Sequence, residues 1–291
     1  MSDPRNLYPK PPFKEVSQSF PGLESKLDPL PDFGLNSYRG TGKLKDKVAV
    51  ITGGDSGIGR AIAYTFACEG ADIVISYHPA EESDAQEVKK TVKSIGRKIL
   101  LLPGDIQQEK QCQLIINKTI ETFGKLDILI NNAAYQKTVD NVEAITKEML
   151  DQIYQTNIYA PFFLSKAAWK YLKPGCSIIN NASVQAYRPS PGIMVYATSK
   201  AALVNMTKSM AQVAMEKGVR VNAVAPGPIW TPLNTIDPSK DHVKNFGSRS
   251  WLKRPGQPIE VAKIFVFLAS DDASYVTGHV YGVTGGSVMG I

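Results

Sequence analysis

From Leu44 onward, short apolar runs alternate with longer amphipathic stretches along the chain. The runs are apolar throughout, which is typical of strands buried on both faces of a parallel sheet. The predicted strands cover 47–53, 71–77, 98–105, 126–133, 176–183, 219–227 and 279–286. The predicted helices cover 57–69, 83–95, 107–123, 146–172, 194–216 and 258–269. We therefore expect an α/β fold with a single Rossmann-type doubly wound domain, in which a seven-stranded parallel sheet carries helices on both faces and binds ligands beyond the carboxyl ends of its strands.

The start of the chain follows neither pattern. Seven of the nineteen prolines fall within the first forty residues. We therefore divide the chain into a proline-rich arm, residues 1–42, and a Rossmann-fold domain, residues 43–291. Apolar residues such as Phe13, Phe20 and Leu27 recur through the arm and would be poorly placed in water. We expect the arm to dock, either onto its own domain or onto a neighbouring subunit.

Composition and charge narrow the function classes. The 33 basic residues are interspersed with 27 acidic ones, and no Lys/Arg block stands out. This predicts no nucleic-acid partner, and the net charge of +6 suits an anionic ligand instead. No apolar run reaches the length of about 18 residues that a membrane span needs, and the N-terminus lacks a secretory apolar region. We expect no membrane association and a cytoplasmic location.

The cysteines and histidines give no sign of a metal site. Cys68, Cys112 and Cys176 are far apart and lack C-x-x-C spacing, and the three histidines are equally scattered. This spacing indicates neither a disulfide framework nor a metal centre, and it favours a reducing compartment.

A glycine-rich stretch, TGGDSGIGRA, follows the first predicted strand and opens the first predicted helix. Gly53, Gly57 and Gly59 permit a tight turn and a close approach of the backbone to a ligand. The free N–H groups and positive dipole of the helix start favour a pyrophosphate. In this position between a strand and a helix, the stretch indicates a dinucleotide site.

The end of the second predicted strand bears on the choice of cofactor. A carboxylate there would accept a hydrogen bond from a free ribose 2′-hydroxyl, but the residues are Ser76, Tyr77 and His78. Arg60, just past the last glycine, could meet a 2′-phosphate. We therefore favour NADP(H) over NAD(H), with two alternatives open: a loop that brings Glu81 back to the ribose, or Arg60 as a solvated helix residue.

The stretch VYATSK places a tyrosine and a lysine four residues apart within a predicted helix. Tyr196 and Lys200 would then lie on the same face, one turn apart. A cation beside a phenol favours the phenolate and lowers its pKa, which makes the hydroxyl a usable proton donor and acceptor. On this stretch alone, an ordinary surface pair remains the alternative.

Together these motifs resemble the classical short-chain dehydrogenase/reductase family. The resemblance rests on TGGDSGIG, NNAA at 131–134, Asn157 in YQTNIYAPF, Ser183 in NNASVQAY, YATSK, and PGPIWTP at 226–232, and it runs from Lys43 to the C-terminus. The arm and the segments HPAEESDAQ, LLPGD and SVQAYRPSP are similar to a subgroup of glucose and ribitol dehydrogenase homologues, general stress proteins and NADP-dependent aldehyde reductases.

The resemblance implies four catalytic residues. Tyr196 would protonate a carbonyl oxygen or take the proton of an alcohol, while a nicotinamide carries the hydride. Lys200 would lower the pKa of Tyr196 and bind the nicotinamide ribose. Ser183 would hold the substrate oxygen, and Asn157 would hold a water that links Lys200 to solvent.

The resemblance also implies a set of cofactor-binding residues. They are Gly53, Asp55, Ser56, Gly57, Ile58, Gly59, Arg60, Tyr77, His78, Asp105, Ile106, Asn132, Ala133, Ala134, Tyr196, Lys200, Pro226, Gly227, Ile229 and Thr231. Ala134 stands where the family usually has glycine, and the added methyl group is small enough for cofactor binding to survive.

Several of these residues have a purely structural interpretation when taken singly. Asp105 could cap a helix, Ser183 could be a turn residue, and Asn157 could be a solvated polar position. Asn131 could either end a strand or contact the adenosine side of the cofactor. The catalytic interpretation prevails because the residues occur together.

The predicted function is an NAD(P)-dependent oxidoreductase that acts on the CH–OH group of a small substrate, such as an aldehyde, ketone or sugar. The alternative is a cofactor-binding regulatory or redox-sensing protein without turnover. The segment 229–258 contains Trp230, Leu233, Phe246 and Trp251, which suggests a partly mobile lid, and Tyr187 and Met194 are expected nearby. The apolar helices 146–172 and 194–216 suggest a homo-oligomer, and the family resemblance implies a tetramer.

Overall fold

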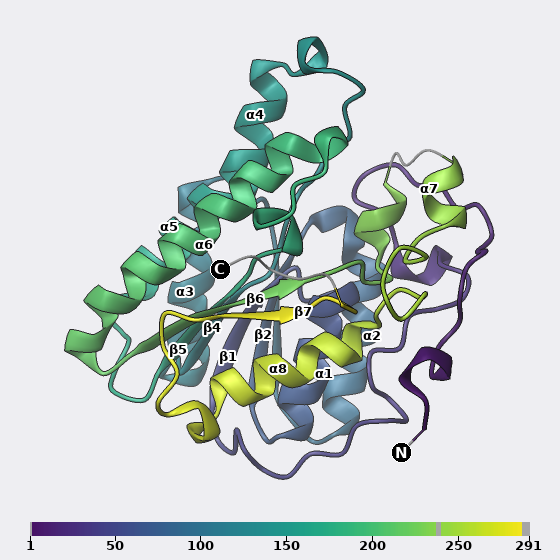
Figure 1. Cartoon of the computed structure of the whole chain (residues 1–291). Helices are drawn as coiled ribbons and strands as arrows, with labels where there is room; N and C mark the ends of the chain where they lie inside the picture. Colours follow the sequence, from purple (N-terminus) through teal and green to yellow (C-terminus); the bar gives the residue numbers. More distant parts are fainter. Residues whose placement is uncertain (1, 237–239, 287–291) are drawn as a thin grey trace.

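A seven-stranded sheet in the order β3-β2-β1-β4-β5-β6-β7 forms the centre of the computed structural model, which describes residues 2–236 and 240–286 (Figure 1). All paired strands are parallel. The strands are β1 (Val48–Thr52), β2 (Asp72–Tyr77), β3 (Ile99–Pro103), β4 (Ile128–Asn131), β5 (Ser177–Asn181), β6 (Arg220–Pro226) and β7 (Val280–Val283). Each lies within the run predicted for it, so the predicted doubly wound fold is confirmed. The strand order reverses between β1 and β4, where open α/β sheets bind their ligands.

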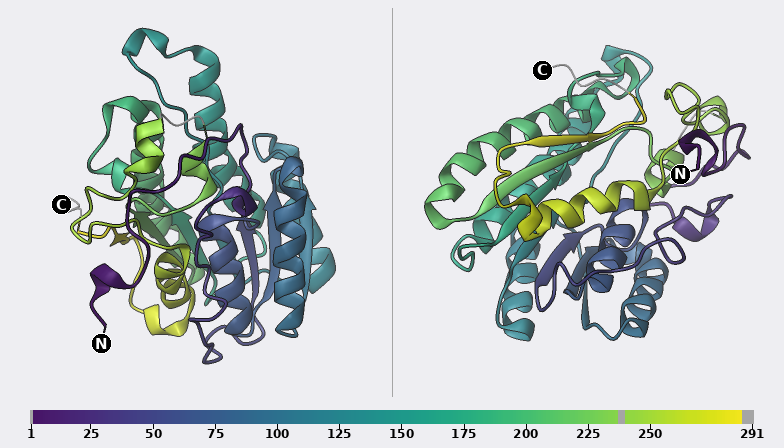
Figure 2. Two further views of the ribbon diagram at one scale, coloured as in Figure 1. Left: turned by 90° about the vertical axis from the view of Figure 1, so that its right-hand side faces the viewer. Right: turned by 60° about the horizontal axis from the view of Figure 1, so that its bottom comes forward.

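Helices cover both faces of the sheet (Figure 2). They are α1 (Gly57–Cys68), α2 (Glu82–Ser94), α3 (Glu109–Phe123), α4 (Lys147–Tyr154), α5 (Ala160–Ala168), α6 (Met194–Ala214), α7 (Lys240–Lys244) and α8 (Pro258–Ala269). Phe66 of α1 and Phe265 of α8 belong to the apolar core on one side, together with residues of α2. Ile116 of α3 and Leu164 of α5 belong to a second core with α6. Two buried faces explain why the strands are apolar throughout.

The single helix predicted over 146–172 is divided in the structure. Helix α4 ends at Tyr154, a π-helical segment covers Gln155–Tyr159, and α5 begins at Ala160. Pro161 lies in the first turn of α5, where its missing N–H costs least. The wider π-helical turn changes the direction in which its side chains point, and such segments occur often at functional sites. Asn157 lies within this segment and is buried.

The segment before β1 packs on the sheet domain of the same chain. It contains two short 3₁₀ helices, η1 (Pro4–Asn6) and η2 (Glu24–Lys26). Phe13 and Leu27 share an apolar cluster with Trp230 and with residues that follow it in the chain. The rings of Phe13 and Trp230 stack with centroids 4.5 Å apart. In Figure 1 this purple segment passes beside α7 on its way to β1.

Within the described ranges, no helix has both the length and the apolar character needed to cross a bilayer. The same residues contain no group of three or more His, Cys, Asp or Glu side chains arranged to hold a metal ion. Cys68, Cys112 and Cys176 are unpaired.

Candidate active site

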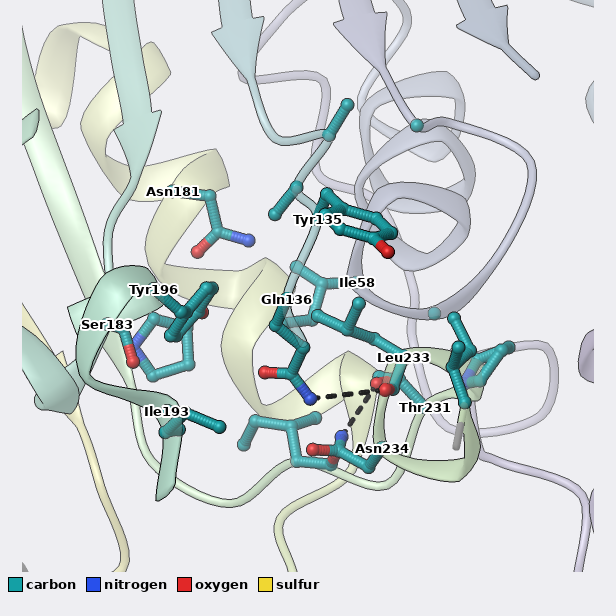
Figure 3. Close-up of a pocket in the computed structure, with 18 of the residues that line it drawn as sticks. Ile58, Tyr135, Gln136, Asn181, Ser183, Ile193, Tyr196, Thr231, Leu233 and Asn234 are labelled. Carbon is teal, nitrogen blue, oxygen red and sulfur yellow. Dashed lines mark hydrogen bonds between the residues drawn. The ribbon is translucent and has the colours of Figure 1, made fainter. Parts of the chain in front are cut away.

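A cavity of about 1170 Å³ opens at the carboxyl ends of the strands, around the point where the strand order reverses. Its wall includes residues that follow β1, β2, β3, β4, β5 and β6. Figure 3 shows Ser183 and Tyr196 on one side of this pocket and Ile58, Thr231 and Leu233 on the other. The cavity therefore lies where the fold predicts a ligand site.

Most of the predicted site residues line the cavity. They are Gly53, Asp55, Ser56, Gly57, Ile58, Tyr77, His78, Asp105, Ile106, Asn132, Ala133, Ala134, Ser183, Tyr196, Lys200, Pro226, Gly227, Ile229 and Thr231. Gly59, Arg60 and Asn157 are not part of the wall, and neither is Asn131. The chain folds so that residues from most of its length meet in one pocket.

The glycine loop is tightly built. A Cβ on Gly59 would lie 1.7 Å from the carbonyl oxygen of Gly53, so only glycine fits where α1 begins. Gly53 has a φ of +59°, which glycine adopts without strain. The side-chain amide of Asn132 donates to the carbonyl oxygens of Thr52 and Gly53, at 2.9 Å each. Gly59 and Asn132 thus fix the shape of the loop that faces the cavity.

The structure shows Arg60 in contact with the arm. Its guanidinium donates to Glu24 Oε1 at 2.8 Å and lies 4.0 Å from the ring centroid of Phe33, and both partners belong to the arm. The second oxygen of Glu24 accepts the backbone N–H of Gly57 at 2.6 Å. Arg60 is therefore held by the arm, and its pairing with Glu24 favours the structural alternative over the expected contact with a 2′-phosphate. Sequence alone gave no signal for this pairing, because Glu24 lies in a segment without periodicity.

The end of the pocket near β2 contains buried carboxyl groups. Burial raises the pKa of Asp55 to about 7, and the nearby Ser56 hydroxyl offsets only part of the rise. Burial and the charge of Asp55 raise the pKa of Glu81 to about 9. Glu81 lines this end of the pocket, and its carboxylate accepts the backbone N–H of His78. These groups favour their neutral forms, so this end carries less negative charge than the sequence suggests.

The opposite end of the pocket holds Tyr196 and Lys200, which both lie on α6 and are 8% and 2% exposed. The ammonium nitrogen of Lys200 lies 5.5 Å from the centroid of the Tyr196 ring. It also donates to the carbonyl oxygen of Asn181 at 2.7 Å. The predicted proximity is thus present, and the pair is buried rather than an ordinary surface pair.

Burial is the main cause of the pKa shifts of this pair. Burial raises the pKa of Tyr196 to about 12, and a hydrogen bond with Ser183 only partly opposes the rise. Burial also lowers the pKa of Lys200 to about 7. Desolvation is the largest cause of both shifts, and the effect of Lys200 on the pKa of the phenol stays a prediction.

Ser183 is a turn residue whose hydroxyl also lies beside Tyr196. Its hydroxyl accepts the backbone N–H of Gln185 at 3.1 Å, which caps a short 3₁₀ helix over Val184–Ala186. The same hydroxyl interacts with the phenol of Tyr196. The turn that follows β5 thus positions a hydroxyl beside the candidate proton donor.

Asn157 lies behind the pocket wall, where its side chain binds the backbone of Tyr135. Its side-chain oxygen accepts the N–H of Tyr135 at 2.8 Å, and its amide donates to the carbonyl of Tyr135 at 2.9 Å. The amide also donates to the Ser199 hydroxyl, which in turn donates to the carbonyl oxygen of Tyr196. Asn157 thus joins the loop after β4 to α6, and the expected water contact stays a prediction.

Sequence reasoning missed three residues of this site. Asn181 binds Lys200 through its carbonyl oxygen, and Phe20 and Pro21 of the arm line the cavity. Asn131 ends β4, as one of its two interpretations expected, and its amide donates to Asn180. The contacts of the missed residues depend on how distant segments meet, which no local motif shows.

The predicted lid is only partly at the pocket. Leu233, Phe246 and Trp251 line the cavity, whereas Trp230 is 1% exposed and packs beneath the arm. Tyr187 and Met194 lie near the site in sequence but are not part of the wall. The arm thus covers a residue that was expected to face the substrate.

Three buried oxygen atoms, two on Asp55 and one on Asn181, indicate what the cavity can hold. Neither carboxylate oxygen of Asp55 makes a hydrogen bond of good geometry to another described residue, and the same holds for the side-chain oxygen of Asn181. Both residues line the cavity. Buried polar atoms normally find partners, so the pocket suits a ligand with hydroxyl or amide donors at both ends. A dinucleotide has such groups.

Comparisons with known proteins show sequence similarity to reductases and dehydrogenases. The sequence profile described as Enoyl-(Acyl carrier protein) reductase matches residues 53–287. The chain is 42% identical over 282 residues to a protein of Arabidopsis thaliana named NADPH-dependent aldehyde reductase 1, chloroplastic, covering 95% of this chain and 98% of that protein. It is 41% identical over 294 residues to a glucose and ribitol dehydrogenase homolog of Oryza sativa subsp. japonica, covering 96% of this chain and 97% of that one.

The chain is also similar to a solved structure. A short-chain dehydrogenase from Burkholderia cenocepacia, crystallised in complex with NADP, superposes with a TM-score of 0.79 at 31% sequence identity. The match covers 84% of this chain and 98% of the other.

Proposed function

Because this chain belongs to the short-chain dehydrogenase/reductase family, we propose that it moves a hydride between a nicotinamide cofactor and a small carbonyl or alcohol substrate. The substrate is an aldehyde, a ketone or a sugar, and the reaction takes place at its CH–OH group. One observation supports this proposal most: the Tyr196–Lys200 pair and the glycine loop line the same cavity. The proton donor therefore faces the space in which a dinucleotide would bind.

The chain's own residues manage the proton and the substrate. A bound nicotinamide supplies or accepts the hydride. In reduction, the Tyr196 hydroxyl donates its proton to the substrate oxygen as the carbonyl carbon receives the hydride. In oxidation, the tyrosinate accepts the proton of the alcohol. Ser183 donates a hydrogen bond to the same oxygen and stabilises its developing charge.

Lys200 and Asn157 position this machinery. Lys200 is held by the carbonyl of Asn181 and brings a titratable group to the phenol. Its pKa of about 7 lets it gain or lose a proton near neutral pH. Asn157 connects the loop after β4 to α6 through Tyr135 and Ser199, so it fixes one wall of the pocket relative to the proton donor.

We favour NADP(H) as the cofactor, with NAD(H) as the alternative. The support comes from the NADPH-dependent relative and from the NADP complex of the similar structure. In this chain, the raised pKa values of Asp55 and Glu81 reduce the repulsion that a 2′-phosphate would meet near His78. The ratio of kcat/KM for the two cofactors tests the preference, and a tenfold advantage for NAD(H) would reverse it.

We also propose that the protein acts in the cytoplasm as a homotetramer. The support for assembly is the set of large apolar side chains that α4–α6 leave exposed: Leu150, Tyr159, Phe162 and Val213. Exposed apolar side chains that form a contiguous patch are typical of an interface between proteins. Light scattering after gel filtration measures the oligomeric mass, and a monomer at all concentrations would contradict the proposal.

The function is tested with Tyr196→Phe on a panel of aldehydes and polyols with both cofactors. We expect kcat to fall by about a thousandfold, since general acid–base catalysis contributes roughly that much. Cofactor affinity should stay within about twofold, because the ring is kept. Tyr275→Phe removes a fully exposed hydroxyl and serves as the control, which should keep full activity. If Tyr196→Phe retained more than a tenth of the activity, the assignment would fail.

A further inference from the structure

Two arm residues, Phe20 and Pro21, belong to the wall of the cavity. The ring of Phe20 makes edge contacts with His78, at 5.4 Å between centroids, and with Tyr135, at 5.2 Å. Phe20 is 43% exposed, so its ring still has surface to offer a ligand. The arm thus contributes an apolar ring to the edge of the cavity.

The positions of these partners show what Phe20 spans. His78 follows β2, and Tyr135 comes shortly after β4. In the sheet, β1 lies between β2 and β4, and the glycine loop follows β1. Phe20 therefore reaches from one side of the strand-order reversal to the other, above the loop that faces a dinucleotide in this fold.

The chain on both sides of Phe20 is firmly anchored. Before it, the backbone N–H of Gln18 donates to the carbonyl of Thr235 at 2.9 Å, and the Gln18 side chain donates to the Thr235 hydroxyl. After it, the buried Glu24 carboxylate accepts the N–H of Gly57 and pairs with Arg60. The backbone N–H of Glu24 also donates to Asp84 at 2.7 Å. Anchors at both ends hold this segment across the pocket.

We propose that residues 18–24 form a strap that completes the cofactor site, with Phe20 packing on the adenosine half of the bound dinucleotide. This inference rests on the proposed function. The end of β2 is where this fold binds the adenosine ribose, and His78 lies there against the Phe20 ring. An aromatic ring stacks on a base or covers a ribose without needing a particular sequence motif. The arm thus contributes directly to the affinity for the cofactor.

The strap also bears on how fast the cofactor dissociates. A dinucleotide that contacts both the glycine loop and Phe20 must lose both contacts to dissociate. Removing the ring should therefore raise the dissociation rate constant, which is where most differences in affinity arise.

The test uses the full chain with Phe20→Ala, and the dissociation constant of NADPH is measured by fluorescence titration. We expect it to rise by about fivefold to twentyfold, the size of a lost aromatic stacking contact. Competition by ADP should weaken by the same factor, because ADP carries the adenosine half alone. Phe20→Tyr keeps the ring and should bind NADPH as the wild type does.

Leu30→Ala is the matched control. Leu30 is an apolar residue of the same arm, is 66% exposed and does not line the cavity. It should change neither the NADPH affinity nor the melting temperature. Phe20→Ala should also melt within about 2 °C of the wild type, since a half-exposed side chain contributes little to folding.

Three outcomes would contradict the proposal that residues 18–24 complete the cofactor site. They are wild-type NADPH affinity in Phe20→Ala, a loss for NADPH without the matching loss for ADP, and a loss that appears only together with a large fall in melting temperature. Failure of the proposed function looks different, because the wild-type protein itself would then bind no NADPH and no NADH.

Discussion

The two ends of the pocket differ in how they are built. At the end formed by β5 and α6, the residues at the proton donor come from a short part of the sequence, whereas the carboxyl groups at the β2 end come from three separate segments. Ser183, Tyr196 and Lys200 lie within eighteen residues of one another. The β2 end combines Glu24 of the arm, Asp55 of the glycine loop and the residues that open α2. One end is thus built by local structure and the other by long-range contacts.

Despite this difference, the same physical effect acts at both ends. Burial lowers the pKa of Lys200 to about 7 and raises that of Asp55 to about 7. In each case desolvation favours the neutral form. The cavity is therefore bordered by groups that can change charge near neutral pH, and the variants below test each end separately.

Lys200→Met tests the catalytic end and should have the largest effect. Without the amine, the proton of Tyr196 is no longer relayed, and we expect kcat to fall by at least about a hundredfold. Stability should change in the opposite direction. The pKa of Lys200 is about 7 in the folded protein and 10.5 in its ordinary state. Burying the charged amine therefore lowers the free energy of unfolding of the wild type by the full amount below pH 7, and this loss disappears above pH 10.5. The variant should gain more melting temperature, relative to the wild type, at pH 6 than at pH 10.

Lys208→Met is the control for this variant. It lies on the same helix and is exposed, so activity and the pH profile of stability should stay as in the wild type. A melting-temperature difference for Lys200→Met that does not depend on pH would show that Lys200 is not strongly desolvated.

The local end could be predicted from the sequence because its geometry follows from periodicity. Four residues make about one helical turn, so Tyr196 and Lys200 had to share a face once α6 was recognised. The strands were predictable for the same reason, since an uninterrupted apolar run fits a strand covered on both faces. The direction of the Tyr196 pKa shift was not predictable, because it depends on burial by the rest of the fold.

The long-range end could not be predicted in the same way. Glu24 and Arg60 are 36 residues apart, and nothing in the arm's sequence sets their distance. The π-helical turn around Asn157 was also missed, because its residues continue an ordinary helical pattern. These features depend on tertiary contacts, which the local propensity of the residues does not predict.

Asp55→Asn tests whether burial controls charge at the β2 end. The folded pKa of about 7 lies above the ordinary 3.8. Asp55 therefore contributes stability below pH 4, which is lost as the pH rises through 7. The amide does not ionise, so the variant should be more stable than the wild type by about 2–4 kcal/mol at pH 8 and similar to it at pH 4. Urea unfolding at both pH values measures the difference.

Asp140→Asn removes an exposed carboxylate and is the control. It should leave the stability difference between the two pH values unchanged. Equal stabilisation by Asp55→Asn at pH 4 and pH 8 would show that the carboxylate is already ionised at low pH, and the two ends would then not share a mechanism.

Arg60→Gln should have the smallest effect, and it tests whether the arm holds the β2 end together. The Arg60 side chain is 17% exposed, and burial raises the pKa of its partner Glu24 to about 7. Glu24 can therefore take up a proton when Arg60 is removed, so the loss of stability should be about 1–2 kcal/mol, below that of a fully buried pair. Arg97→Gln breaks the partly buried pair with Asp72 elsewhere and is the control for stability.

In Arg60→Gln, the ratio of kcat/KM for NADPH and NADH should stay within about threefold of the wild-type ratio, because a guanidinium held by Glu24 does not reach the 2′-phosphate. A tenfold fall in that ratio would place Arg60 at the cofactor after all, and the β2 end would then be set by the glycine loop rather than by the arm.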